Sequence, residues 1–574
     1  MYKIKQNFMV FKKLTKMCLL LSMMVIGHMM YGQDMTIKGV IKSSDDWQPL
    51  IGATVLVKGT TRGTNTDLDG RFTIQAKEGD VLQISYVGWQ EREITIGKNT
   101  SLDILLKPSA TKLDEVTITA ALGQVVKKRN ISYSAQEVNV EELTRTGSPN
   151  IFSNLNGRVA GLTVTPTSGV AGASISINLR GPASIDGNNQ PLIVVDGLPI
   201  DNRTFSQGAL TTDQPNRTAD YTNRGLDLNP NDIESLIVLK GPEAAALYGI
   251  DASSGAILIT TKKAGKGGGR VTYDNFFRFD EVYRLPKYSA NFQRGFNGIN
   301  EVNTLNYFGE RIPEGTETFD NVGNFFRTGK MQTHNMTVEG GSDNITYRLS
   351  GGYTNQDGVV PTNDFSRLSF RLNTTARINK KLSATTSFNY INTNGNSPLR
   401  GAGGFLLSLF QWPSTDDASV YLNEDGTRKR IVPALTVEPE NPFFNVAFNR
   451  NSSRTKRTIG NLSLVHNTTD WLSFTARLGA DSYSTLGGQF THPFSNAGVT
   501  TAGRVETFSE VSLLLNGNIL GTIKKSFNDF NLTFVAGGTF DDRNYEVTST
   551  RGEKLFLPDF ESVNNTDPTT QRSK

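Results

Sequence analysis

Apolar and polar residues alternate over long segments of the chain from about residue 271 onward. Between 367 and 378, the even-numbered positions, such as Leu368 and Phe370, are apolar or small, and the odd-numbered ones are arginine, serine, asparagine or threonine. The same period of two recurs in four other segments: 345–353, 382–390, 472–478 and 530–540. Successive side chains of a strand point to opposite faces, so these segments predict strands with one apolar and one polar face.

Strands of about ten residues with this pattern suit an antiparallel transmembrane β-barrel, with lipid outside and water inside. A soluble β-sandwich with one wet face gives the same alternation, so the pattern alone leaves both possibilities open. Four aromatic residues are expected at strand ends, where they would suit a membrane-interface girdle, although a sandwich can also carry them: Tyr353, Tyr390, Trp471 and Tyr483. Polar stretches at 285–330 and 412–457 predict long loops.

Shorter alternating runs occupy residues 35–107, for example RFTIQA from Arg71 and VLQISYVG from Val81. Short strands separated by turn residues predict a small β-sandwich. The sequence DLDG at 67–70 lacks the remaining oxygen ligands of a calcium loop, so a tight turn is the better interpretation.

Residues 131–266 combine helix and strand signals and predict a small α+β domain. Ser148 and Pro149 are suited to begin a helix that Gly161 ends, with Phe152 and Leu155 on its apolar face. Asp196 and Gly197 join two apolar runs and predict a hairpin turn. The last part predicts a strand, a short helix led by Pro242 and ended by Gly249, and another strand.

Residues 1–32 have the pattern of an export signal, with five lysines, an apolar stretch from Cys18 and a small residue before Gln33. The apolar stretch is too short to cross a bilayer comfortably. Between the sandwich and the α+β domain, residues 108–130 form a connector. Its segment LDEVTITA (113–120) predicts a short strand that either pairs with another protein or closes the sandwich.

Composition disfavours several functional classes. The net charge of +4 without a basic block gives no sign of nucleic-acid binding. One cysteine and four scattered histidines offer no disulfide, zinc pattern or other metal site. The glycine-rich KKAGKGGGR at 262–270 lacks the residues that a phosphate-binding loop needs after its lysine. No nucleophile, carboxylate pair or cofactor motif stands out, so we expect no enzyme and no cofactor.

Four strings in order resemble the plug domain of the SusC/RagA family of TonB-dependent outer-membrane transporters: LNGRVAGLTV, LRGPAS, QPLIVVDGLPI and DIESLIVLKGPEAAALYG. The sandwich sequence resembles the carboxypeptidase-regulatory-like module that precedes this plug. The resemblance implies a mainly β chain with a signal peptide (1–32), the regulatory-like sandwich (33–107), a linker with the TonB box (108–130), the plug (131–266) and the first part of an outer-membrane barrel (267–574).

The resemblance assigns candidate residues to the two functional parts. The TonB box, which would pair with TonB, is placed at Asp114, Glu115, Val116, Thr117, Ile118 and Thr119. The plug motifs that would maintain the integrity of the plug contain Gly157, Arg158, Gly161, Arg180, Gly181, Asp196, Gly197, Lys240, Gly241, Tyr248 and Gly249.

The implied function is TonB-energised import of a large nutrient, an oligosaccharide or a peptide, across the outer membrane. The implied partners are TonB, a SusD-like lipoprotein, the glycan or peptide ligand and the lipid bilayer. A TonB-linked signal transducer and a secreted or surface glycan-binding β protein are the alternatives. About nine or ten barrel strands can be placed, against the 22 of plugged transporters, so we expect a truncated product or a partial sequence.

Overall fold

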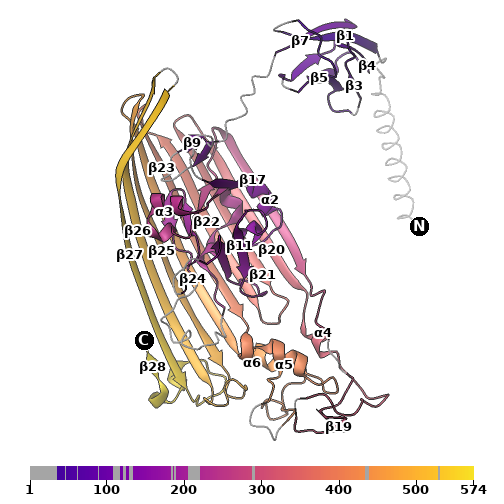
Figure 1. Cartoon of the computed structure of the whole chain (residues 1–574), viewed down its shortest axis with the longest axis vertical. Helices are drawn as coiled ribbons and strands as arrows, with labels where there is room; N and C mark the ends of the chain where they lie inside the picture. The colour runs from indigo at the N-terminus through magenta and orange to yellow at the C-terminus, as the bar shows by residue number, and fades with distance from the viewer. Residues whose placement is uncertain are drawn as a thin grey trace, which may run out of the picture. The chain divides into compact units, whose positions relative to one another are not determined.

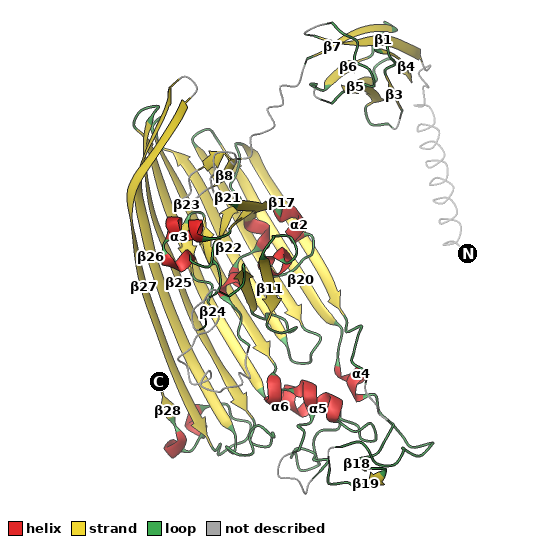
Figure 2. Cartoon of the chain, in the orientation of Figure 1, coloured by secondary structure: helices red, strands yellow, loops and turns green. Residues whose placement is uncertain are grey.

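The computed structural model describes residues 35–44, 47–60, 62–87, 89–107, 117–119, 125–127, 134–182, 185, 189–203, 220–287, 291–304, 306–432, 438–527 and 530–574. The chain divides into two compact units, Met1–Thr117 and Ile118–Lys574. Within the described residues, no helix has both the length and the apolar character needed to cross a membrane. The chain is mainly β (Figure 2), as the sequence predicted.

The first unit contains the predicted sandwich. One sheet has the order β4-β1-β7 and the other the order β3-β2-β5-β6. The strands are β1 (Met35–Ser43), β2 (Thr54–Val57), β3 (Gly63–Asn65), β4 (Arg71–Ala76), β5 (Val81–Ser85), β6 (Arg92–Thr95) and β7 (Ser101–Leu106). Alternate residues of β4, including Phe72 and Ile74, enter a core shared by both sheets. In the predicted turn, the Asp67 carboxylate accepts hydrogen bonds from the backbone N–H groups of Asp69 and Arg71, which confirms a tight turn.

The connector contributes two short strands, β8 (Thr117–Thr119) and β9 (Val125–Lys127), which form a two-stranded sheet. The second half of the predicted TonB box is therefore a strand. Its first half, Asp114 to Val116, and the predicted signal peptide lie outside the described residues.

The α+β domain is built on a five-stranded sheet with the order β10-β15-β16-β13-β14 and a separate hairpin of β11 and β12. Its strands are β10 (Ala135–Val138), β11 (Leu162–Pro166), β12 (Ile175–Leu179), β13 (Leu192–Val195), β14 (Leu198–Ile200), β15 (Ile233–Leu239) and β16 (Ala256–Thr261). Its helical segments are α2 (Val140–Thr144), η3 (Ile151–Leu155), η5 (Arg224–Asp227), η6 (Pro230–Asp232), α3 (Pro242–Tyr248) and η7 (Ile250–Ala252).

The helix predicted from Ser148 to Gly161 is wrong in length and type. Only the 3₁₀ segment η3 forms, and its cap is Asn150, whose side chain accepts a hydrogen bond from the backbone N–H of Phe152. Gly157 has a φ of +76°, which ends any regular continuation. The apolar residues of the predicted face, including Phe152 and Leu155, are nevertheless buried, because the short segment turns them into the same core.

The remaining residues form one antiparallel sheet of ten strands, whose order follows the sequence from β17 to β28. The strands are β17 (Gly267–Asp280), β20 (Gly329–Gly341), β21 (Ile345–Asp357), β22 (Asp364–Arg377), β23 (Leu382–Ser397), β24 (Arg450–Asn467), β25 (Leu472–Thr491), β26 (Arg504–Phe527), β27 (Phe530–Glu553) and β28 (Arg572–Ser573). The α+β domain lies against one face of this sheet (Figure 1).

Short turns join the strands at one end of the sheet and long connections join them at the other. The long connections contain β18 (Gly295–Phe296), β19 (Ile299–Asn300), α4 (Asn321–Phe325), η8 (Gly401–Gly403), α5 (Phe405–Gln411), α6 (Pro442–Phe448), η9 (Val563–Asn565) and η10 (Pro568–Thr570). Helices α4, α5 and α6 pack around a shared apolar cluster that includes Phe325 and Leu409. The predicted loop 412–457 ends earlier than expected, because β24 already begins at Arg450.

The polarity of the sheet is the reverse of that in a soluble β-sandwich. Apolar side chains lie on the outer face, and polar side chains face the α+β domain. On β22, Leu368 and Phe370 are exposed on the outer face, whereas Arg367 and Arg371 are buried under the α+β domain. The alternation read from the sequence is therefore confirmed, with the polar positions inside. Tyr483 is an exception to the predicted aromatic girdle, because it is buried on the inner face of β25.

Candidate functional site: the contact between the α+β domain and the sheet

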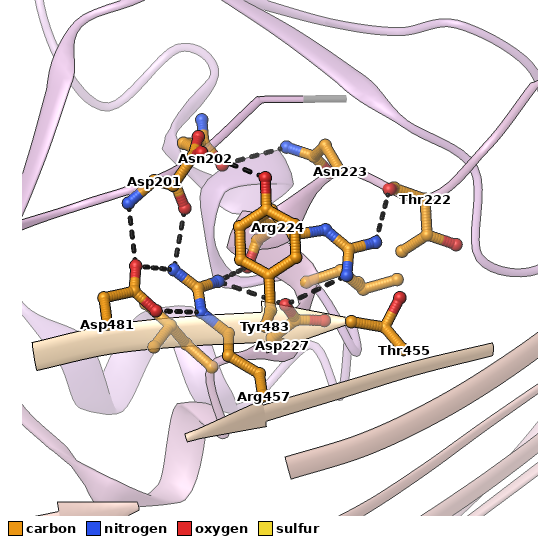
Figure 3. Close-up of polar contacts among 12 residues, drawn as sticks. Asp201, Asn202, Thr222, Asn223, Arg224, Asp227, Thr455, Arg457, Asp481 and Tyr483 are labelled. Carbon is orange, nitrogen blue, oxygen red and sulfur yellow. Dashed lines mark hydrogen bonds and ion pairs between the residues drawn. The ribbon is translucent and has the colours of Figure 1, made fainter. Parts of the chain in front are cut away.

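Arg457 on β24 is the centre of the contact between the sheet and the α+β domain (Figure 3). Its Nε and Nη2 donate to the two carboxylate oxygens of Asp481 on β25, at 2.8 and 2.7 Å. Its remaining N–H groups reach the α+β domain, where they meet three acceptors: the Arg224 carbonyl at 2.9 Å, the Asp227 carboxylate at 3.1 Å and the Asp201 carbonyl at 2.8 Å. All five donors of the guanidinium are thus used.

Asp201 of the α+β domain makes hydrogen bonds to two further residues of the sheet at the same site. Its backbone N–H donates to the Asp481 carboxylate at 3.0 Å, and its carboxylate accepts from the Tyr483 hydroxyl at 3.0 Å. Arg203 pairs with that carboxylate through Nε and Nη2. Burial would raise the pKa of Asp201, but the hydrogen bonds and charge of Arg203 outweigh it and hold the pKa below its usual value. Asp201 therefore remains an anion inside the contact.

Three further arginines on the inner face of the sheet bind the α+β domain. Arg348 on β21 pairs with Asp232 at 2.8 Å, and Ser350 also donates to that carboxylate. Arg371 on β22 pairs with Asp196 at 2.9 Å and donates to the Thr261 hydroxyl at 2.8 Å.

Arg367 is held without a carboxylate. Its Nη1 lies within 3.0 Å of three backbone carbonyl oxygens of the α+β domain, those of Pro149, Leu226 and Leu228. A guanidinium can satisfy itself with carbonyl groups because it presents several donors in a fixed plane.

The contact therefore combines several buried polar pairs with apolar packing. On the apolar side, Ile391 and Ile459 of the sheet join the core cluster of the α+β domain, and Leu198 of the hairpin β13–β14 packs against Gly479 on β25. Buried ion pairs add little net stability, but breaking one by removing a partner is costly, because a charge is left without compensation. A buried polar network whose groups are satisfied holds a domain in one specified position.

Two parts of the chain match known domain families, and the chain is similar in sequence to known receptors. Residues 37–118 match the CarboxypepD_reg-like domain and residues 127–256 match the TonB-dependent receptor plug domain. The chain is 36% identical over 349 residues to the TonB-dependent receptor SusC of Bacteroides thetaiotaomicron, a match that covers 60% of this chain and 32% of SusC. It is 28% identical over 545 residues to the TonB-dependent receptor P26 of Formosa agariphila, covering 92% of this chain and 51% of P26.

The chain is a relative of the SusC-type TonB-dependent receptors. It spans about half, or less, of the length of the curated relatives it matches. Its fold is similar to that of a chain in the structure of the RagAB peptide importer in the open-open state, with a TM-score of 0.61 and 21% identity, covering 80% of this chain and 53% of the other. The α+β domain, which the plug-domain model matches up to residue 256, is called the plug from here on, and the buried contact described above holds it against the sheet.

The residues predicted from the plug motifs are mostly turn positions. Eight of the eleven have a positive φ: Gly157, Gly161, Arg180, Gly181, Asp196, Gly197, Gly241 and Gly249. At Asp196 and Gly197 the φ values are +51° and +87°, as the hairpin between β13 and β14 requires. Asp196 has a second role that the sequence did not indicate, because it binds Arg371 of the sheet.

The structure brings two of the predicted motifs together at Gln136 on β10. Its side-chain N–H donates to the Arg158 carbonyl at 2.8 Å, and its side-chain oxygen accepts from Lys240 at 2.6 Å. Arg158 also pairs with Glu142 at 2.6 Å. Tyr248 on α3 packs against the small plug core that contains Leu239 and Ala244. These contacts are internal to the plug, so their role in plug integrity stays a prediction.

Sequence reasoning missed the anchoring residues on both sides of the contact. The plug carboxylates Asp201 and Asp227 lie outside the quoted motifs, and Asp232 opens the motif DIESLIVLKGPEAAALYG without a sign of its anchoring role. On the sheet, the available signal was arginine at positions that alternate with exposed apolar residues, as at Arg367 and Arg371. Within the described part of the chain, no group of three or more histidine, cysteine, aspartate or glutamate residues is placed to hold a metal ion.

Proposed function

We propose that the chain belongs to a transporter that imports a large nutrient, an oligosaccharide or a peptide, across the outer membrane with energy supplied through TonB. We assign it the role of the SusC-like partner of a SusD-like lipoprotein, with the signal peptide 1–32 removed. In this proposal residues 33–107 are a periplasmic module, 108–130 the TonB-box linker, 131–266 the plug and 267–574 barrel strands that cross the outer membrane. The transport needs no covalent chemistry and no cofactor.

The observation that carries the proposal is the pairing of a lipid-compatible outer face with a plug held on the inner face by buried arginines. An outer face that exposes Leu368, Phe370 and Phe534 is compatible with a hydrocarbon environment. The plug on the inner face would occlude the lumen, and its polar anchors are of the kind that force can open and water can replace.

The TonB box would transmit that force. Thr117, Ile118 and Thr119 are already in a strand conformation, so they can add to a sheet edge of TonB by main-chain pairing. Tension on this segment acts on β10 and α2, the first plug elements after the linker, and then on the arginine contacts. The named relatives SusC and P26 are TonB-dependent receptors, which supports the same mode of coupling.

The test is made in the complete gene. Ile118→Pro removes a backbone donor from the TonB-box strand, and Ile118→Val is the matched control that keeps both donor and β-propensity. The expected result is loss of growth on whichever glycan or peptide requires the intact gene for Ile118→Pro, normal growth for Ile118→Val, and equal surface abundance of both. Normal growth of the proline variant at equal abundance would contradict TonB coupling.

A further inference from the structure

The outer face of β24 changes from apolar to basic along the strand. Leu462 and Leu464 are exposed on this face near the short turn, and Arg450, Arg454 and Lys456 are exposed on it toward the long connections. A charged side chain on a lipid-facing strand is unfavourable at the middle of a bilayer and nearly neutral at the interface. The three cations therefore need a place at or beyond the edge of the hydrocarbon layer.

The length of a membrane crossing puts Arg454 and Lys456 at that edge. A tilted strand crosses the hydrocarbon layer with about 9–11 residues. Counted from Asn467, where β24 meets the short turn, such a crossing ends close to Lys456. Thr458, the next outer residue, pairs with Tyr390 of β23, and tyrosine is favoured at the level of lipid headgroups. Long connections of plugged barrels are extracellular, so this level belongs to the outer leaflet.

Charge on this face is not balanced. The outer positions of β22 to β26 hold four lysine or arginine residues and one carboxylate: Arg450, Arg454, Lys456, Lys525 and Asp364. Asp364 accepts a hydrogen bond from the Asn396 amide at 2.9 Å. Glu561, from a long connection, pairs with Arg450. Lys525 stands apart near the short turns, so the excess positive charge at the headgroup level is that of Arg454 and Lys456.

Neither Arg454 nor Lys456 has a carboxylate partner in the part of the chain that the structure describes. Arg454 donates through Nε to the Asn394 side chain at 2.8 Å, and its other N–H groups make no bond to the described residues. The cross-strand neighbours on the same face are uncharged: Asn394 and Leu486 beside Arg454, and Asn392 and Ser484 beside Lys456. The two cations are therefore available to an anion from outside the chain.

A hollow of about 430 Å³ lies beside Arg454, within the size range of small-ligand sites. Its outer-face lining includes two arginines, two amides, a leucine and a glycine: Arg450, Arg454, Asn394, Asn396, Leu486 and Gly488. Glu561, the partner of Arg450, also lines it. The guanidinium fork of Arg454 fits the oxygens of a phosphate, and a lysine ammonium adds a point charge.

We propose that Arg454 and Lys456 bind the phosphate group of a lipid in the outer leaflet. The headgroup enters the hollow, and the acyl chains lie against the exposed apolar side chains farther along the face, among them Leu462 and Leu478. Continuity of the basic pair with this apolar surface favours a lipid, since a free anion would use the cations alone. The inference rests on the proposed placement in the outer membrane, but it is independent of TonB coupling and of the cargo.

The test uses the complete protein, purified in detergent and stripped of lipid, with native mass spectrometry as the readout. The probes are lipid A that carries one phosphate and the same lipid with the phosphate removed. We expect the phosphorylated lipid to bind roughly ten-fold more tightly, as hydrogen bonds to charged groups imply. Arg454→Gln with Lys456→Gln should abolish this preference. Lys380→Gln with Lys524→Gln, two exposed lysines at the short-turn end, should leave it unchanged.

Three outcomes would overturn the proposal. They are equal binding of the two lipids by the wild type, an unchanged preference in the Arg454→Gln/Lys456→Gln variant, and full displacement of the lipid by inorganic phosphate at the same concentration, which would mean that the site takes the free anion. Equal denaturant midpoints of the variants show that a lost adduct is not caused by unfolding.

Two further measurements separate this inference from the proposed function. Ile118→Pro should bind the phosphorylated lipid as the wild type does, even though growth on the nutrient is lost. Membrane fractionation of the wild type tests the placement itself. Protein that is found in the outer membrane but does not prefer the phosphorylated lipid would overturn the lipid site alone, and protein that is absent from the outer membrane would overturn both.

Discussion

Arg457 on β24 and Asp481 on β25 form a two-bond ion pair across neighbouring strands, with side-chain exposures of 0% and 3%. The pair faces the plug, and the same guanidinium continues to Asp227 and to two plug carbonyl groups. The sheet therefore fixes the arginine, and the arginine fixes the plug. Arg224 of the plug also lies 3.6 Å from Asp227, and Arg203 pairs with Asp201, so the local charges include three arginines and three aspartates.

Arg457→Met should weaken plug anchoring strongly. The substitution leaves the carboxylates of Asp481 and Asp227 buried with one cation fewer, and breaking such a pair costs about 3–5 kcal/mol. We expect a lower free energy of unfolding in detergent and faster proteolysis of the plug. The double variant Arg457→Met/Asp481→Leu should recover part of the loss, since Arg224 still compensates Asp227.

Arg454 provides the matched control on the same strand. It points to the outer face of the sheet and donates to the Asn394 side chain, away from the plug. Arg454→Met should change the free energy of unfolding by less than about 1 kcal/mol, as expected for an exposed polar contact. Equal losses in Arg454→Met and Arg457→Met would contradict the anchoring role of Arg457.

The sequence predicted the sheet more completely than the anchoring site, for reasons visible in β24. Alternation identifies a strand only where one face is apolar, as in β22. Residues 450–457 are polar on both faces, because the outer positions lie near the end of the sheet and the inner ones meet the plug. That segment was therefore predicted to be part of a loop, so Arg457 was not recognised as a residue of the sheet.

The plug motifs were readable from the sequence for a different reason. Turns that need a positive φ demand glycine, asparagine or aspartate at fixed positions, so Asp196 and Gly197 could be located without a structure. An ion pair across domains has no such local signature. Its partners are separated by 175 residues in the case of Arg371 and Asp196, and only the folded chain brings them together.

Asp196 should separate the hairpin role from the anchoring role. Asp196→Asn keeps a side chain that tolerates the left-handed conformation and can accept from the Thr261 N–H, but it loses the charge that binds Arg371. Asp196→Ala loses the acceptors as well and adds backbone strain of about 1–2 kcal/mol. The free energy of unfolding should fall in the order wild type, Asn, Ala. An Asn variant as unstable as Ala would show that the ion pair dominates.

Gly479 on β25 should not tolerate a side chain. A Cβ at this position would overlap the isobutyl group of Leu198, which is buried in the plug hairpin. Because Leu198 cannot leave without pulling the hairpin, Gly479→Ala should destabilise plug docking by about 1–3 kcal/mol, as overpacking does. Gly460→Ala on β24 is the control, since a Cβ there meets nothing within 4 Å. Protease protection of the plug measures both variants, and comparable protection would contradict the close contact.

Glu440, in the connection between α5 and α6, should make the stability of the chain depend on pH near neutrality. Burial raises its pKa to about 7, against the opposing charge of Arg428 and a hydrogen bond from the Asn496 N–H. A folded-state pKa above the ordinary value of 4.5 means that protonation favours the folded chain. This contribution is complete below about pH 4.5 and is lost as the pH rises through 7.

The free energy of unfolding should therefore fall by about 1 kcal/mol between pH 6 and pH 8 because of this one group. Glu440→Gln removes the titration and should flatten that part of the profile, while Glu424→Gln, which is exposed in the same connection, should leave it unchanged. The measurement is the denaturant midpoint at a series of pH values in detergent. If the profiles of the Glu440→Gln variant and the wild type stay parallel from pH 6 to pH 8, the Glu440 carboxyl does not titrate in this window. In that case the charge of Arg428 stabilises the Glu440 carboxylate by more than burial destabilises it.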